Sequence, residues 1–89
     1  KQNPKYVKVW YFKGFALIQT EKYDKALECF EKALDLNPET GHAWSGKGLG
    51  LEKLGKSEEA LKSYKKALQI NPNSQISKKG IENLQTAKT

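Results

Sequence analysis

The 89-residue sequence contains no arginine and no methionine, and it has only one cysteine, Cys29, and one histidine, His42. A single cysteine cannot form an internal disulfide, and one histidine with no partner at ligand spacing does not make a metal site. We expect Cys29 to be an inert packing residue and His42 to be solvated or to line a groove. No apolar run approaches the roughly 20 residues that a membrane helix needs, and nothing at the start resembles a secretory signal. The expected protein is soluble and cytoplasmic, without a metal or other cofactor.

The lack of arginine also bears on the class of partner. The formal net charge is +6, and all sixteen basic residues are lysines. Arginine supplies a planar fork for bidentate contacts with phosphates and bases, whereas lysine is a solvated point charge that is favoured on helix surfaces. The positive excess lies toward residues 41–89, where no arginine or aromatic platform accompanies it. We therefore expect a solvated surface there and keep weak, salt-sensitive nucleic-acid binding as an alternative.

What the sequence does contain is an internal repeat. The pattern W-x2-K-G-x2-L, then A-x3-F or A-x3-Y, then Pro, occurs twice with a period of 34 residues. Each period predicts two antiparallel helices, because its apolar residues recur at helical spacing and a proline stops the second helix. Small residues on the apolar side let another helix approach, and aromatic residues fill the space beside them. The recurring pairs are Trp10 and Trp44, Gly14 and Gly48, Leu17 and Leu51, Ala26 and Ala60, Phe30 and Tyr64, Ala33 and Ala67, and Pro38 and Pro72.

This pattern resembles that of the tetratricopeptide repeat family over about residues 3–72. The resemblance implies an all-α helical solenoid with one helix-turn-helix repeat at about 7–40, a second at about 41–74, and a capping helix at about 75–87. Two departures from the family pattern occur in both copies, which indicates a subfamily variant. Lys13 and Lys47 stand where the pattern prefers Leu, and Leu17 and Leu51 stand where it prefers Tyr.

The first predicted helix is apolar nearly all round, which is not typical of a surface helix. It follows an Asn3-Pro4 pair like the one that ends each repeat, and the chain does not begin with methionine. We therefore expect a fragment of a longer array, in which an upstream repeat covers this helix. Self-association through the same helix is also expected, because two repeats bury little surface and about three are normally needed. The apolar residues are Val7, Val9, Trp10, Tyr11, Phe12, Phe15, Leu17 and Ile18.

Two motifs that occur in enzymes fall in the wrong structural context. The segment GLEKLGKS, residues 50–57, satisfies the P-loop expression, but a P-loop needs a preceding buried strand and an acid that organises Mg²⁺. Gly46, Gly48 and Gly50 alternate as in a dinucleotide-binding loop, yet they fall inside a predicted helix. Gly48 is expected to serve helix packing, whereas a wider ligand groove and simple packing both stay open for Gly46 and Gly50. We expect no catalytic residue and no enzyme activity.

The resemblance implies a scaffold for protein–protein interaction, because the first helices of such repeats line a concave surface that holds a peptide or partner domain. Members that bind heat-shock chaperones clamp a terminal carboxylate with Lys and Asn, but neither inner helix here contains Asn, so an apolar or mixed peptide is expected. For Tyr11, Phe12 and Phe15, packing against an upstream repeat or a second copy is an equal alternative. A regulatory module of a larger enzyme is another open reading. The implied peptide-binding residues are Lys8, Tyr11, Phe12, Phe15, Ile18, Gln19, His42, Ser45, Leu49, Glu52 and Lys53.

Overall fold

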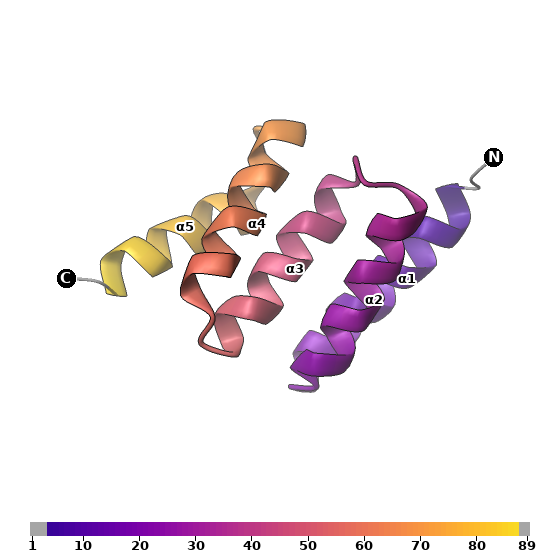
Figure 1. The fold of residues 1–89 in the computed structure, drawn as a ribbon, viewed down its shortest axis with the longest axis horizontal. Helices are drawn as coiled ribbons and strands as arrows, with labels where there is room; N and C mark the ends of the chain where they lie inside the picture. The colour runs from indigo at the N-terminus through magenta and orange to yellow at the C-terminus, as the bar shows by residue number, and fades with distance from the viewer. Residues whose placement is uncertain (1–3, 88–89) are drawn as a thin grey trace.

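The computed structural model describes residues 4–87, and this part of the chain forms five α-helices and no strand. The all-α prediction is therefore confirmed. Figure 1 shows the helices following one another along an elongated array, with the N-terminus at one end and the C-terminus at the other. The helices are α1 (Pro4–Gln19), α2 (Tyr23–Leu36), α3 (Gly41–Lys53), α4 (Ser57–Ile70) and α5 (Gln75–Ala87).

The helices lie in two layers, one formed by α1, α3 and α5 and the other by α2 and α4, and the array curves toward the first layer. Helix α3 contacts both α1 and α5, whereas α2 and α4 make no contact with each other among the described helices. Figure 1 shows α2 and α4 in front, with α1 and α5 behind them. Because the first helices approach one another and the second helices do not, the array is narrower on the side of α1, α3 and α5. This side is the inner face.

Each repeat places one buried aromatic ring between two glycines. The Phe30 ring lies between Gly14 of α1 and Gly46 of α3, and a Cβ built on Gly14 would come within 2.7 Å of that ring. The Tyr64 ring lies between Gly48 of α3 and Gly80 of α5, and a Cβ on Gly48 would come within 2.6 Å. Such distances leave no room for a methyl group. Glycine therefore stands on both sides of each ring because a larger residue does not fit.

This arrangement decides the question that the sequence left open for Gly46 and Gly50. Gly46 faces the Phe30 ring, and Gly50 faces Leu27 and Ile18, so both glycines serve helix packing. Helix α5 repeats this packing, since Gly80 lies one period after Gly46 and faces the Tyr64 ring as Gly46 faces the Phe30 ring.

The turn inside each repeat uses one residue with positive φ. Glu21 has a φ of 63° and Gly55 a φ of 82°, and the two positions are one period apart. After each of them a backbone N–H returns to the preceding helix, from Lys22 to the carbonyl of Leu17 and from Lys56 to that of Leu51. This pattern ends a helix in a Schellman-type turn. The GKS segment therefore belongs to a helix-terminating turn, as the repeat pattern indicates, and not to a loop that follows a strand.

Candidate peptide-binding surface on the inner helices

The inner face contains one cavity where side chains of two repeats meet. Its volume is about 250 Å³, and α1 and the start of α3 line it together with the connection between α2 and α3. Three of the residues expected to bind a peptide, Lys8, Tyr11 and His42, lie together around it. The other lining residues are Val7, Asn37, Glu39, Thr40 and Gly41.

Aromatic stacking holds this cavity in shape. The rings of Tyr11 and His42 are parallel within 7°, with centroids 5.0 Å apart. Tyr11 is buried while His42 is exposed, so the imidazole covers the phenol and presents its other face outward. The start of α3 is held by Thr40, whose hydroxyl donates to the carbonyl of Asn37 over 2.7 Å. The two repeats therefore share a rigid contact at the edge of the cavity.

Sequence reasoning missed the loop side of this cavity. Asn37, Glu39 and Thr40 were outside the predicted set, because they precede the inner helix and do not recur on its stripe. The Asn37-Pro38 pair was a usable signal, since it places a tight connection directly before α3. That connection also receives a hydrogen bond from the indole of Trp44, whose Nε1 donates to the carbonyl of Pro38 over 2.7 Å.

Several predicted residues have other positions in the structure. Ser45 is buried, and its hydroxyl donates to the carbonyl of His42, so it does not present a free group to a ligand. Ile18 packs toward Gly50. Phe12 is 62% exposed and lies outside the cavity lining. The remaining predicted residues keep some exposure: Lys8, Gln19, His42 and Lys53 are exposed, and Phe15, Leu49 and Glu52 are half-buried.

Glu52 of the predicted set has a partner inside the protein. The Tyr64 hydroxyl donates to Glu52 Oε1 over 2.7 Å. Burial raises the pKa of Tyr64, and the hydrogen bond to Glu52 and the charge of that carboxylate raise it further. Glu52 thus has a partner inside the second repeat, and a ligand can use only its remaining lone-pair sites.

A second hollow, which we call the seam groove, lies between the helices of the first repeat. Two ammonium groups flank the Trp10 ring there, Lys13 at 5.6 Å and Lys32 at 5.5 Å from the ring centroid. The buried Cys29 thiol lies beside them, and its pKa is raised, because burial outweighs the opposing charge of Lys13, and the effects of Glu28 and Lys32 are smaller. A raised pKa keeps a thiol protonated and unreactive, as expected for a packing residue. The groove is lined by Trp10, Lys13, Leu17, Lys22, Lys25, Glu28, Cys29 and Lys32.

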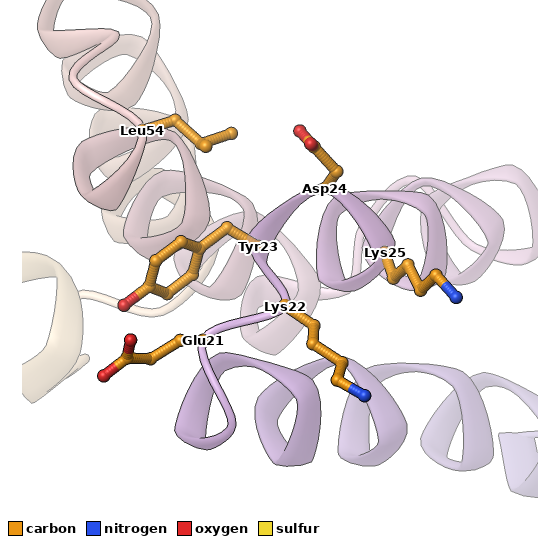
Figure 2. Close-up of a pocket in the computed structure, with 6 residues that line it drawn as sticks. All are labelled: Glu21, Lys22, Tyr23, Asp24, Lys25 and Leu54. Atoms are coloured by element: carbon orange, nitrogen blue, oxygen red, sulfur yellow. The ribbon is translucent and has the colours of Figure 1, made fainter.

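A third hollow, of about 400 Å³, lies at the turn between α1 and α2 (Figure 2). In Figure 2 the charged ends of Lys22, Asp24 and Lys25 point away from one another, and Leu54 approaches from the second repeat. The Glu21 carboxylate and the Tyr23 hydroxyl lie on the same side in Figure 2, away from the ends of Lys22 and Lys25. Because the charged groups of both signs do not converge on one point, we do not take this hollow as the candidate site.

Two kinds of site are absent among residues 4–87, a cluster of metal-ligating side chains and a membrane-spanning helix. Residues 4–87 bring together no group of three or more His, Cys, Asp or Glu that could hold a metal ion. None of the five described helices has the length and apolar character needed to cross a membrane.

Stacked antiparallel helix pairs with small residues facing buried rings define an α-helical repeat protein. The family description that matches is Tetratricopeptide repeat, at residues 7–40 and 42–74. The chain belongs to the tetratricopeptide repeat family, so the resemblance seen in the sequence is confirmed.

Solved structures agree on the fold. The structure of MamA D159K mutant 2 is 30% identical with a TM-score of 0.77, and the match covers 96% of this chain and 47% of that chain. The chain therefore spans about half the length of that protein.

Two other solved structures show the fold alone. The first TPR of Spaghetti (RPAP3), bound to the HSP90 peptide SRMEEVD, is 21% identical with a TM-score of 0.53, over 97% of this chain and 95% of that one. The first TPR domain of human RPAP3 is 23% identical with a TM-score of 0.56, over 96% and 94%. The comparison with curated proteins found no match.

Proposed function

We propose that this chain is a protein-interaction module that holds an extended peptide, or a segment of a partner protein, on its inner face. The proposed centre of binding is the cavity around Lys8, Tyr11 and His42. The observation that carries the proposal is that these side chains come from two repeats and line one open cavity. A ligand there touches both repeats at once, so its binding depends on the stacked fold and not on a single helix.

The chemistry of the inner face favours a peptide of mixed character. The cavity offers one ammonium group on Lys8, one carboxylate on Glu39, and the flat imidazole of His42. Phe15 and Leu49 are half-buried and supply apolar surface on the same two inner helices. The RPAP3 domain binds an acidic HSP90 peptide, but neither α1 nor α3 here contains an Asn for a carboxylate clamp. The loop residue Asn37 does line the cavity, and its Oδ1 already accepts a hydrogen bond from the backbone N–H of Glu39. The ligand we propose therefore has an apolar side chain next to a polar or charged one.

A peptide library displayed on phage tests this proposal. The peptide it selects should bind at least about tenfold more weakly to Lys8→Glu and to His42→Ala, because each change removes about 1.4 kcal/mol or more of binding free energy. The matched control is Lys65→Glu on the exposed surface of α4, which should leave the affinity unchanged.

Three results would count against the proposal. Equal affinity for all four proteins would move the site elsewhere, and selection of acidic C-termini alone would contradict the mixed chemistry. A gel shift with RNA or DNA that survives near-physiological salt would favour the nucleic-acid alternative instead.

The proposal includes a cytoplasmic location. The support is the unpaired, buried thiol of Cys29, which suits a reducing compartment. Fractionation of cells that express the protein checks this, and recovery in an oxidising compartment would contradict it.

A further inference from the structure

The outward surface of α1 differs from the equivalent surfaces of α3 and α5. We call Val9, Phe12 and Ala16 the edge stripe. They lie at i, i+3 and i+7 on one side of α1, and all three are exposed, Val9 at 54% and Phe12 at 62%. Tyr6 beside them is 61% exposed. The equivalent positions are Ala43, Gly46 and Gly50 in α3, and Ser77, Gly80 and Leu84 in α5, and all six are buried.

The difference in side-chain size decides what can cover each stripe. In α3 and α5 the glycine forms a hollow that receives the aromatic ring of the preceding second helix, Phe30 at Gly46 and Tyr64 at Gly80. In α1 the same position carries the Phe12 ring. A preceding repeat with an aromatic residue at the position of Phe30 would have to place its ring where Phe12 already stands. The edge stripe is a ridge, and a ridge packs into a groove of small residues.

Charge gives a second condition. In the second repeat Lys47 lies over the Trp44 ring, and its ammonium pairs with Glu31 Oε2 of the preceding helix over 2.8 Å. Lys13 holds the same place over Trp10, but among residues 4–87 no carboxylate forms a salt bridge with it. The second repeat therefore shows which group the first one lacks, a carboxylate supplied by a neighbouring helix.

The same charge argues against a second copy as the cover. Helix α1 contains three lysines and no acidic residue between Pro4 and Gln19. Two copies packed with α1 against α1 would bring these ammonium groups together, and like charges across an interface oppose association.

We propose that the edge stripe is a docking surface for an acidic amphipathic helix of a partner protein. That helix carries a small residue opposite Phe12 and a carboxylate that pairs with Lys13. Its apolar side covers Val9, Ala16 and Tyr6. This surface adjoins the inner face, because the Phe12 ring contacts the Tyr11 ring at 4.9 Å between centroids, but none of its three residues lines the cavity. The proposal therefore gives the protein a second place at which a partner binds.

The chain itself supplies matched probes for this surface. Helix α2 is the helix that covers α3, so a peptide of residues 23–36 carries the spacing of a covering helix. Its Cys29 is replaced by Ser, the residue at the equivalent Ser63, and it is cross-linked on its polar side, because free helices this short are marginal in water. Three versions are compared: one with Phe30 retained, one with Phe30→Ala, and one with both Phe30→Ala and Glu31→Lys.

Binding to the whole 89-residue protein is followed by NMR titration of backbone amides. The Phe30→Ala peptide should bind at least about tenfold more tightly than the peptide with Phe30, equivalent to about 1.4 kcal/mol. Adding Glu31→Lys should weaken binding by about threefold, and Lys13→Glu in the protein should restore it. The shifts should centre on Val9, Phe12 and Lys13. His42→Ala should leave the affinities for the three peptides unchanged, because His42 lines the cavity and is not part of the edge stripe.

Phe12→Ala in the protein provides the reciprocal variant. The Phe12 side chain is mostly in solvent, so the variant should fold, and it should lose the preference between the peptides with Phe30 and with Ala at that position. Circular dichroism checks the fold.

Several outcomes would overturn the proposal. One is equal or tighter binding of the peptide with Phe30, which would assign the stripe to an ordinary preceding repeat. Another is a dimer in sedimentation that Phe12→Ala dissociates, which would assign the stripe to a second copy, as the sequence led us to expect. Shifts confined to Lys8 and His42, or no shift at millimolar concentrations of any of the peptides, would equally rule it out.

Discussion

The two buried aromatic rings, Phe30 and Tyr64, are packed in the same way but differ in the polarity of the ring tip. Phe30 and Tyr64 lie one period apart, and each ring is held between two glycines. At the end of the first inner helix stands Ile18, and at the equivalent position of the second stands Glu52, which accepts the hydroxyl hydrogen bond of Tyr64. The repeat with the apolar Phe30 ring therefore has the apolar Ile18 at this position, and the repeat with the Tyr64 phenol has the Glu52 carboxylate. The glycines fix where each ring lies, and Glu52 supplies the hydrogen-bond partner that the buried Tyr64 hydroxyl needs.

The first way to break this comparison is to remove a ring. Phe30→Ala should cost about 3–5 kcal/mol of unfolding free energy, because the ring is fully buried and its removal leaves a cavity between α1 and α3. Urea denaturation followed by circular dichroism measures this loss. The control is Phe12→Ala, which should change stability by less than about 0.5 kcal/mol because its side chain is exposed. Similar losses in both variants would mean that the Phe30 site does not organise the fold.

The second change fills the hollow that receives the ring. Gly46→Ala should cost about 1–3 kcal/mol, because the added methyl group overlaps the Phe30 ring between packed helices. At Gly50 the nearest atom is Leu27 Cδ2 at 3.1 Å, the end of a flexible side chain that can move. Gly50→Ala should therefore be close to neutral, since alanine also favours the helix by up to about 1 kcal/mol. Thermal denaturation of the two variants gives the comparison, and a neutral Gly46→Ala would show that the ring is free to shift.

The third change removes the hydroxyl group of Tyr64. Tyr64→Phe should lower stability by about 1–2 kcal/mol at neutral pH, because the half-buried Glu52 carboxylate loses its 2.7 Å partner. A stability equal to or above that of the unchanged protein would mean that Glu52 is satisfied by water.

The same residue gives a pH dependence of known sign. Burial and Glu52 raise the pKa of Tyr64 above the value of about 10 for an unfolded tyrosine. Below about pH 10 the hydroxyl is protonated in both states, so its contribution is complete. Above that pH the unfolded chain loses the proton first, and stability falls as pH rises. Denaturation between about pH 8 and 11 should show a steeper fall in the unchanged protein than in Tyr64→Phe, and equal slopes would contradict the assignment.

The smallest effect concerns the salt bridge between Glu31 of the first repeat and Lys47 of the second. Glu31→Gln should cost at most about 1 kcal/mol, because both side chains of the Glu31–Lys47 pair are partly exposed. The loss should shrink as sodium chloride is raised, since salt screens exposed pairs. Lys13→Ala, at the unpaired equivalent of Lys47, should show no such salt dependence. Equal salt dependence at both positions would mean that Lys13 has a partner in the free protein.

Much of the fold was predictable because the landmarks repeat. The helix pairs follow from apolar spacing and from Pro38 and Pro72, and Gly14 and Gly48 were read correctly as positions of close packing. The function of Gly46 was not predictable, because a glycine in a helix has the same sequence appearance whether it faces a ligand or a ring. Only the position of Phe30 from a different helix distinguishes the two.

The candidate site was predictable in part, for a related reason. Periodicity correctly assigns Lys8, Tyr11 and His42 to the first helices, and the structure brings them together around one cavity. It does not show that Ser45 is covered or that Glu39 and Thr40 reach the same cavity, because the loop before α3 has no helical period.

Taken alone, the sequence determined that this protein is a tandem array of helix pairs, since spacing along one chain is enough to specify each local element. The tertiary structure alone decided which surfaces are free. A residue such as Phe12 occupies a position that is glycine in the next two inner helices, but its exposure depends on what packs against it. Contacts between residues far apart in the chain set burial and pairing, and no local pattern contains them.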